Sequence, residues 1–368
     1  MSHLEVYPSA LNSDRFEMVA LGSIVVERAE RASLMELPAL SVGKLGVTTQ
    51  LEGVAKQNSE VLRKVVRKGD LVINSRADRK GAAGLSLYEG SVSPVYSVMI
   101  PKAELLSAKY GHYLLRSVAF QEEFFRWGTG IVSDLWSTNF TRMARIRVPL
   151  PPLTIQNSIA SYLDRETGEI DAMLDELTET LRLRRAQAIQ SAVRSSRSIG
   201  IGLMLDVKLG KMLQTKPKCP TDHLQPYLRA AHIQPGGRLD LAIDTKEMYF
   251  SEREAEALSL RAGDAVIVEG GAGFGRAAYL TEDMPGWGFQ NSIIRLRGAS
   301  SDTRYAVYAL QAALESEEIA IACNAATFAH FTAEKVEGFR IPYHGTDEHQ
   351  RIADHLDEVT GRIDAMLA

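Results

Sequence analysis

Residues 147–174 read RVPLPPLTIQNSIASYLDRETGEIDAML, and residues 340–367 read RIPYHGTDEHQRIADHLDEVTGRIDAML. The two stretches align without gaps at an offset of 193 positions, and each ends in the same run, Ile-Asp-Ala-Met-Leu. The chain therefore contains one segment twice. A period of this length indicates a duplicated pair of domains, because the repeats of a solenoid are only about 20–50 residues long.

A second, weaker repeat precedes each copy. RKGDLVI at residues 67–73 resembles RAGDAVI at residues 261–267. In both, a Gly-Asp turn leads into an apolar run, which predicts a turn that feeds a buried strand. The chain is therefore organised as a variable unit, a helical copy, a second variable unit and a second, short helical copy, at residues 1–146, 147–199, 200–339 and 340–368.

Each helical copy begins after prolines, which favour an extended entry. Thr154 and its counterpart Asp347 are good N-cap residues. Apolar residues then recur at steps of three and four, which is typical of an amphipathic helix or a coiled-coil seam. The repeated glycine, Gly168 and Gly361, predicts close approach of another backbone. The apolar stripe consists of Ile159, Leu163, Ile170, Leu174, Leu177 and Leu181, and then of Ile352, Leu356, Ile363 and Leu367.

The first helix, if unbroken from Thr154 to about Arg197, would be roughly 65 Å long, which suits a spacer. A generic dimerising coiled coil is the alternative interpretation. The variable units contain both strand-like and helix-like segments, so each unit is expected to be a compact α/β domain. Strands are expected at 69–73, 92–100, 265–268 and 292–296, and helices at 110–126 and 305–322.

The composition describes an ordinary globular protein. The chain has 368 residues, of which 45% are hydrophobic and 24% charged, and its formal charge is −4. No apolar run reaches the about 18 residues of a membrane span, and the N-terminus does not resemble a signal peptide. Only Cys219 and Cys323 are present, so neither a disulfide framework nor a cysteine zinc site is expected. We expect a cytoplasmic protein without membrane contact.

The sequence carries no recognisable catalytic or metal-binding motif. It lacks a Gly-x-x-x-x-Gly-Lys-Ser/Thr phosphate loop, and Leu150 stands where an amino-methyltransferase needs Asn or Asp before Pro-Pro. The glycine cluster at 270–275 does not fit Gly-x-Gly-x-x-Gly; a tight loop after a strand is expected there, and a loop near DNA is the alternative. His344, His349 and His355 do not share one helical face, so we expect packing or surface histidines.

These features together resemble the specificity (S) subunit of a type I DNA restriction–modification complex. The block Ile146–Leu153 with Gln156, Ile159, Tyr162–Asp164 and Ile170–Asp171 resembles that family's central conserved region, and Arg340–Leu367 resembles its distal conserved region. Two further pairs of segments fit the family pattern, namely Gly69–Asn74 followed by Ser93–Tyr96, and Thr327-Phe328 followed by Phe331–Lys335. No single one of these motifs is highly specific for the family. The order and spacing of the motifs, which occur twice along the chain, are specific for it.

The resemblance implies two target-recognition domains that each read one half of a split DNA sequence. The conserved helices would pair antiparallel as a coiled-coil spacer with pseudo-twofold symmetry and would dock two methyltransferase (M) subunits. Restriction (R) subunits would join the full complex. The chain itself would hold no catalytic residue and no cofactor, since S-adenosylmethionine, ATP and Mg belong to partner subunits. A coiled-coil scaffold that does not read DNA and a stand-alone enzyme acting on DNA are the alternatives.

Candidate DNA contacts follow from residue type, because cations contact phosphates and Arg, Lys, Asn and Gln read bases. In the first unit the loop at 74–81 follows a strand, and the basic turn at 63–68 is the next choice, with a solvated turn as the alternative. The candidates are Arg76, Arg79, Lys80, Arg63, Lys64, Arg67 and Lys68, and in the second unit Lys208, Lys211, Lys216, Lys218, His232, Gln234, Arg238 and Asn291.

The second helical copy is shorter than the first. Members of this family continue into a long second helix, whereas residues 347–368 would span only roughly 33 Å. A shorter spacer, cover by another subunit and a truncated product are the three explanations left open. We expect the stripe at 174–192 to lack a partner and the isolated chain to self-associate, which light scattering would detect.

The charge is unevenly distributed. Residues 1–150 carry 19 Lys and Arg against 15 Asp and Glu, whereas residues 201–340 carry 15 against 18 and residues 341–368 carry 2 against 6. The first unit is therefore mildly cationic, as phosphate contact requires, and the second is not. We expect weak DNA affinity in the absence of the M subunits.

Overall fold

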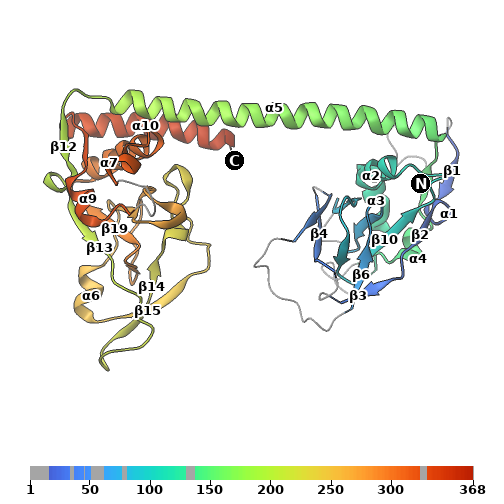
Figure 1. Cartoon of the computed structure of the whole chain (residues 1–368), viewed down its shortest axis with the longest axis horizontal. Coiled ribbons are helices and arrows are strands. Elements are labelled where there is room, and N and C mark those ends of the chain that lie inside the picture. The colour runs from blue at the N-terminus through green and yellow to red at the C-terminus, as the bar shows by residue number, and fades with distance from the viewer. Residues whose placement is uncertain are drawn as a thin grey trace. The chain divides into compact units, whose positions relative to one another are not determined.

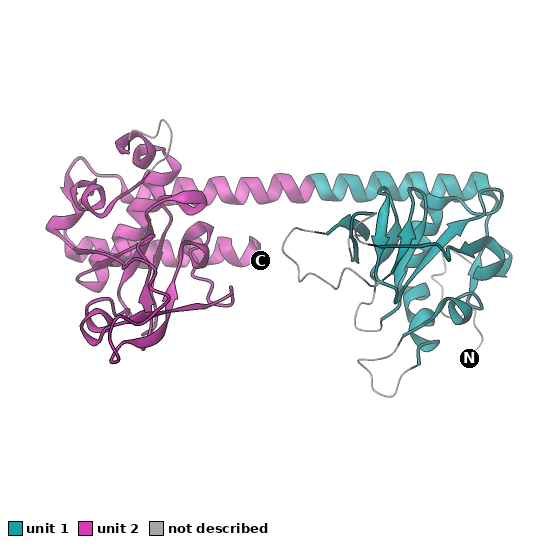
Figure 2. Cartoon of the chain, turned by 60° about the horizontal axis from the view of Figure 1, so that its bottom comes forward, with its two compact units in different colours: residues 1–172 teal, residues 173–368 magenta. Residues whose placement is uncertain are grey.

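The computed structural model describes residues 16–33, 37–44, 46–50, 62–76, 81–129, 137–323 and 330–367. The chain divides into two compact units, unit 1 with residues 1–172 and unit 2 with residues 173–368 (Figure 2). The division falls inside the long helix α5, Leu153–Val193. Among the described helices, none is both long and apolar enough to cross a membrane.

Unit 1 is built on two antiparallel sheets (Figure 1). The first consists, in order, of β2 (Val25–Glu27), β10 (Tyr96–Pro101), β7 (Leu71–Asn74) and β8 (Ala83–Leu85). The second consists of β3 (Arg31–Ala32), β6 (Arg63–Val66) and β9 (Gly90–Val92). The other elements are the hairpin β4 (Leu40–Gly43) and β5 (Gly46–Thr49), and the helices α1 (Leu21–Ile24), α2 (Ala108–Arg116), α3 (Val118–Arg126) and α4 (Phe140–Met143).

Unit 2 repeats this plan of two sheets, except that its second sheet contains one parallel pair of strands. Its first sheet consists, in order, of β13 (Asp206–Leu209), β19 (Ile293–Arg297), β16 (Ala265–Val268) and β17 (Ala277–Tyr279). Its second consists of β15 (Lys246–Phe250), β14 (His223–Leu228) and β18 (Gly288–Phe289), of which β14 and β18 are the parallel pair. The helices are α6 (Glu252–Ala257), α7 (Ser300–Glu315), α8 (Glu318–Ala322), α9 (Ala333–Gly338) and α10 (Thr346–Leu367), with the 3-10 turns η4 (Ile201–Leu203), η5 (Ala230–His232), η6 (Pro235–Gly237) and η7 (Gly271–Gly273).

A two-stranded clamp closes each unit just before its helical copy. In unit 1, β1 (Met18–Ala20) pairs with β11 (Arg147–Pro149), and in unit 2, β12 (Ser198–Gly200) pairs with β20 (Arg340–Pro342). A buried tyrosine ties each clamp to a helix of its unit, Tyr110 in α2 and Tyr305 in α7. The Tyr110 hydroxyl donates to Pro149 O at 3.1 Å, and the Tyr305 hydroxyl donates to Pro342 O at 3.0 Å. The sequence repeat is therefore a structural repeat as well.

The repeated Gly-Asp turn is held by the aspartate. Asp70 is 2% exposed and accepts two hydrogen bonds from Arg28, at 2.7 and 2.8 Å. Asp264 is 0% exposed and accepts two from Arg297, at 2.6 and 2.7 Å. Each carboxylate also accepts a hydrogen bond from the backbone three residues earlier, which closes the turn. Arg28 follows β2, whereas Arg297 is the last residue of β19. The two units therefore share a buried ion pair, but its arginine comes from a different place in each unit.

Within unit 2, α5 and α10 lie side by side and antiparallel, as both views show (Figures 1 and 2). At one end of the pair His344 Nε2 lies 3.1 Å from Val193 O, and at the other Arg185 Nε lies 3.0 Å from Asp364 Oδ1. The expected antiparallel pairing is confirmed for this part of α5. It corrects in part the expectation that the stripe at 174–192 lacks a partner, because Leu181 and Ile189 are buried, whereas Leu174 and Leu177 are exposed.

Two expected helices are interrupted. The helix expected at 110–126 is α2 and α3, because Ser117 has extended backbone and its hydroxyl caps α3 by accepting from Phe120 N. The helix expected at 305–322 is α7 and α8, because Glu317 adopts a left-handed φ of 62°. A Cβ built at Gly168 or Gly361 meets nothing within 4 Å, so neither glycine permits close approach of another part of this chain.

The strands expected at 265–268 and 292–296 are confirmed as β16 and β19, and the glycine cluster at 270–275 contains the turn η7. His349 is a packing histidine. It is fully buried, stacks on Tyr305 with ring centroids 4.0 Å apart, and places Nδ1 2.7 Å from Asp302 Oδ1. Its Nε2 accepts from His344 N, so the Nδ1 proton points to Asp302. In unit 1 the equivalent position holds Gln156, also buried and hydrogen-bonded.

Stability is expected to depend on pH through His349. Burial lowers the pKa of His349 below its ordinary value near 6.5. As pH falls below about 6.5, the unfolded chain gains a proton that the folded chain does not, so the free energy of unfolding falls until pH passes the folded pKa. Between pH 8 and 5.5 the wild type should lose more stability than His349→Gln in urea denaturation, and an equal loss would contradict this. Burial also lowers the pKa values of His112 and His232. Both histidines are present in the wild type and in His349→Gln, so they do not contribute to the difference between the two.

Candidate nucleic-acid interface

The basic turn of unit 1 is less available than expected. Arg63 is 5% exposed and binds Ser91, so the prediction that its guanidinium contacts DNA is wrong in this fold. Lys64 pairs with Glu27 at 3.1 Å and Arg67 with Glu30 at 3.0 Å. Lys68 is exposed on the Gly69 turn, and Arg76 is exposed after β7. Both remain predicted contacts, whereas Arg79 and Lys80 lie outside the described residues.

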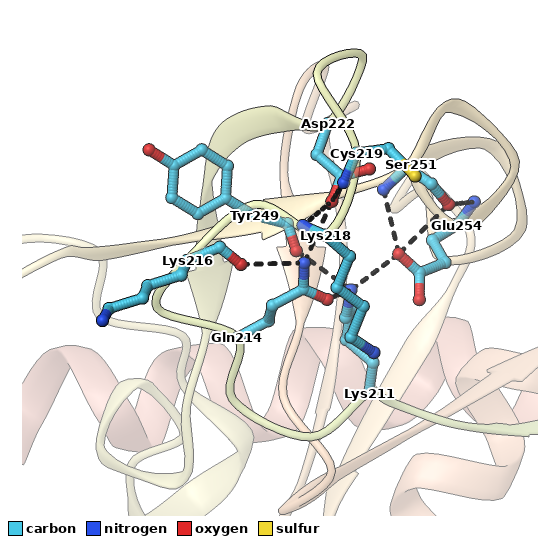
Figure 3. Close-up of polar contacts among 9 residues, drawn as sticks. All are labelled: Lys211, Gln214, Lys216, Lys218, Cys219, Asp222, Tyr249, Ser251 and Glu254. Atoms are coloured by element: carbon cyan, nitrogen blue, oxygen red, sulfur yellow. Dashed lines mark hydrogen bonds and ion pairs between the residues drawn. The ribbon is translucent and has the colours of Figure 1, made fainter.

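In unit 2 the loop between β13 and β14, residues 210–222, is anchored by Lys211. The Lys211 ammonium donates to Glu254 Oε2 at 2.6 Å, to Tyr249 O at 2.9 Å and to Gln214 Oε1 at 3.0 Å (Figure 3). It also lies 5.0 Å from the ring centroid of Phe250. Its side chain is only 11% exposed, so Lys211 holds the loop to β15 and α6. This corrects the expectation that Lys211 contacts DNA phosphates.

Asp222 holds the other end of the loop. Its Oδ2 accepts from Lys218 N at 2.7 Å, Gln214 Nε2 at 3.0 Å and Cys219 N at 3.2 Å (Figure 3). The backbone N–H of Lys218 is the largest cause that lowers the pKa of Asp222. Burial would raise the pKa of Glu254, but the bonds from Lys211 and Ser251 outweigh it and lower that pKa. Both carboxylates therefore stay ionised near neutral pH, and the loop keeps its anchors.

The loop presents cations outward. Lys208, Lys216 and Lys218 are exposed, and in Figure 3 the Lys216 side chain extends away from the anchoring cluster. Asn291, predicted separately, adjoins this loop, because its backbone N–H donates to Lys211 O at 2.8 Å. Phosphates are bound by exposed lysines and bases by amides. The structure thus gathers four of the candidates of unit 2, Lys208, Lys216, Lys218 and Asn291, around one ordered loop.

The other candidates of unit 2 lie elsewhere. His232 is 0% exposed, and its Nδ1 accepts from Arg229 N at 3.1 Å, so the prediction of a base contact by His232 is corrected. Gln234 donates to Ala231 O at 2.7 Å and is partly exposed. Arg238 is exposed, but the adjacent turn η6 meets α5, because Gly236 O accepts from Arg185 at 2.8 Å. Gln234 and Arg238 stay predicted contacts, separate from the loop at 210–222.

Loosening the loop is expected to expose it to protease. Asp222→Ala removes the acceptor of three donors in the loop, whereas Asp244→Ala removes a carboxylate that lies 3.9 Å from Arg229 and outside the loop. We expect trypsin to cut after Lys218 several-fold faster in Asp222→Ala, because a cleavable segment must leave its fixed conformation. Mass spectrometry of the fragments measures the rate, and a rate no higher than that of Asp244→Ala would contradict the anchoring role.

The residues predicted to dock subunits divide into two groups. Leu181 and Leu356 are buried, and Ile159, Leu163, Ile352, Ile363 and Leu367 are partly buried within their own units. Ile170, Leu174 and Leu177 are each more than half exposed, with Met173 beside them at 66%. This segment of α5 is the part of the stripe left open to another chain, since apolar patches on a helix mark contact surfaces.

Equivalent polar contacts fix the helical copies to their units. In unit 1 the Tyr113 hydroxyl donates to Asp164 at 2.7 Å, and Lys109 pairs with the same carboxylate at 2.6 Å. In unit 2, Tyr308 binds Asp357 at 2.5 Å. Arg304 of unit 2 pairs with the same Asp357 at 2.8 Å. Asp164 and Asp357 are the repeated aspartates of the Leu-Asp pair, so this repeated residue attaches each helical copy to its unit.

Some participants are visible only in the structure. No sequence motif predicts the hydrogen bonds that Asp222 and Tyr249 make with the loop. Met212 and Leu213 are 76% and 52% exposed, although apolar side chains are usually expected to be buried. Glu254 carried a signal, because Ser251-x-x-Glu254 is a capping box, which the structure contains at the start of α6.

Comparisons with known proteins agree with this organisation. The family model described as type I restriction modification DNA specificity domain matches residues 201–366. One similar chain comes from a structural study of complex assembly and conformational transition of the type I R-M system. It is 17% identical to this chain, the comparison covers 96% of this chain and 92% of that chain, and the TM-score is 0.50. At this identity the likeness shows a shared fold.

Two further solved structures are similar at lower scores. The HsdS subunit from Thermoanaerobacter tengcongensis is 17% identical, with 95% and 90% of the chains covered and a TM-score of 0.41. The type I restriction-modification system S subunit from M. genitalium is 14% identical, with 96% and 92% covered and a TM-score of 0.38. No curated protein sequence matches the chain. The duplicated sequence and the duplicated units agree with the family model, which identifies residues 201–366 as similar to the type I restriction modification DNA specificity domain.

Proposed function

We propose that the chain is the sequence-specific DNA-recognition subunit of a type I restriction–modification complex, in which unit 1 and unit 2 each read one half of a split target. The observation that carries this is the duplication of a whole recognition unit, clamp and helix included, in a chain whose residues 201–366 match the DNA specificity domain. Two similar units on one chain fit a target with two parts. The loop at 210–222 supplies unit 2 with fixed, exposed cations.

The helices α5 and α10 serve as the spacer and docking elements in this proposal. The exposed segment around Ile170, Leu174 and Leu177 would be covered by methyltransferase subunits, of which the duplication suggests two. Restriction subunits would join the full complex. S-adenosylmethionine, ATP and Mg would be bound by these partners, and this chain would contribute recognition without catalysis. Such a complex acts on cytoplasmic DNA. No observation favours the scaffold that ignores DNA.

Methyladenine-resolving sequencing of genomic DNA tests the proposal. A strain that carries the gene should show a methylated motif of two conserved blocks separated by unspecified base pairs, and deletion of the gene should abolish that motif. Reintroduction of the gene should restore it. An identical set of methylated sites with and without the gene would contradict the proposal.

A further inference from the structure

Met212 and Leu213 lie between two fixed points of the loop at 210–222. On one side Lys211 N donates to Phe289 O at 3.2 Å and Lys211 O accepts from Asn291 N at 2.8 Å. On the other, Gln214 O accepts from Tyr249 N at 3.0 Å. The preceding Gly210 fits only without a side chain, because a Cβ there would lie 2.3 Å from Gln290 O. The backbone that carries the two apolar residues is therefore held firmly.

These two side chains nevertheless face solvent. Met212 is 76% exposed and Leu213 52%, and Leu224, at the start of β14, is 50% exposed. Exposing apolar surface costs about 25 cal/mol per Å² relative to burying it. Because the anchors prevent the loop from folding inward, the exposure is built into the fold. Apolar residues held outward in this way indicate a contact surface.

The chemistry around the pair identifies the occupant as duplex DNA. Lys208, Lys216 and Lys218 are exposed on the same loop and the strand before it, and Asn291 is bonded to the anchor. A protein or lipid occupant would not need these exposed lysines, whereas the phosphates of DNA do. Between phosphate contacts, apolar side chains meet thymine methyl groups or the face of an opened base step, and Met and Leu are among the residues found there.

We propose that Met212 and Leu213 are specificity-determining residues that make apolar contact with base pairs of the half-site read by unit 2. This inference rests on the proposed function and adds to it the residues that read. Lys216 and Lys218 contact phosphates of the DNA backbone, and the anchored segment 211–214 places the two apolar side chains against the bases. Lys211, Asp222 and Glu254 are positioning residues, since they act through the loop.

The test combines methyladenine sequencing with two double variants and one control. Met212→Ser with Leu213→Ser should relax one block of the split motif at one or more positions, or lower its methylation about tenfold, while the other block stays unchanged. Met212→Leu with Leu213→Met keeps apolar surface and should retain the motif. Ile321→Ser, at a position in α8 that is 72% exposed, removes an equally exposed apolar side chain and should change nothing.

The outcomes separate this inference from the function on which it rests. A wild type without a split motif overturns the proposed function. If the wild type shows a split motif and the serine double variant leaves that motif intact, the role of Met212 and Leu213 is overturned and the proposed function is not. An effect of Ile321→Ser equal to that of the serine double variant overturns the same role. If the serine double variant loses all methylation, two controls decide the meaning. The loss supports the role of Met212 and Leu213 when hydrogen exchange shows β14 and β15 protected as in the wild type and the partner subunits still copurify. The loss counts against that role when either control fails.

A binding experiment distinguishes the two forms of apolar contact. The wild-type complex is titrated with its target duplex and with a duplex in which deoxyuridine replaces thymidine in that half-site. A several-fold loss of affinity that the serine double variant no longer shows assigns the contact to thymine methyl groups. Equal affinity for the two duplexes, with the serine variant weaker on both and its block relaxed, assigns it to the face of a base step.

Discussion

Asp264→Ala is expected to destabilise unit 2 by about 3–5 kcal/mol, because it leaves the Arg297 guanidinium partly buried without its carboxylate. Asp264 is 0% exposed, accepts two bonds from Arg297 and closes the turn by accepting from Arg261 N at 2.9 Å. Such a loss is a large part of the about 5–15 kcal/mol by which a domain is stable.

Hydrogen exchange with mass spectrometry measures this effect unit by unit. Asp264→Ala should lower protection across the sheet β13-β19-β16-β17 and leave unit 1 protected, while Asp70→Ala should do the reverse. Glu348→Ala is the control in unit 2, because its carboxylate is 45% exposed and pairs at 2.9 Å with Arg351, which is 76% exposed, so about 1 kcal/mol or less is expected. An Asp264→Ala effect as small as the control would contradict the structural role of the repeated turn.

Lys216→Ala with Lys218→Ala is expected to weaken DNA binding of the complex about tenfold at fixed salt, through the loss of two phosphate contacts. Both lysines are exposed, and their backbone groups already bind within the loop, so truncating the side chains leaves the anchors in place. Each lost contact should reduce the slope of log affinity against log salt by about 0.9.

Fluorescence anisotropy of a labelled target duplex at several salt concentrations measures both quantities. Lys216→Arg with Lys218→Arg keeps the charges and should retain the wild-type slope. The alanine variant should weaken cognate and unrelated DNA alike, because phosphate contacts carry no sequence information. An unchanged slope would show that the exposed lysines of this loop do not face DNA.

The sequence repeat predicted the duplicated units, the long helix and its shorter copy, because apolar periodicity and N-capping are local properties. The breaks at Ser117 and Glu317 were not predicted, since a serine and a glutamate also occur inside helices. Packing of the chain around each residue decided those positions. The stripe of α5 illustrates the same limit, because periodicity alone does not distinguish Leu181, buried beside α10, from Leu177, which is exposed.

The candidate DNA contacts could be predicted by type and not by exposure. Lys211, Lys216 and Lys218 are equivalent in the sequence, yet only Lys211 is held by Glu254, which lies 43 positions further along the chain. Arg63 is likewise hidden by Ser91, 28 positions away. Such pairs depend on how strands from distant parts of the chain meet. For the same reason residue type offered no reason to single out Met212 and Leu213.

Selection from a pool of random-sequence duplexes, bound to the complex purified through a tag on this chain, tests the central claim most directly. The recovered DNA should contain two conserved blocks separated by a fixed number of unspecified base pairs, and the complex with Met212→Ser and Leu213→Ser should relax only one block. A single continuous motif, or a pool that shows no enrichment, would contradict recognition of a split target by two units.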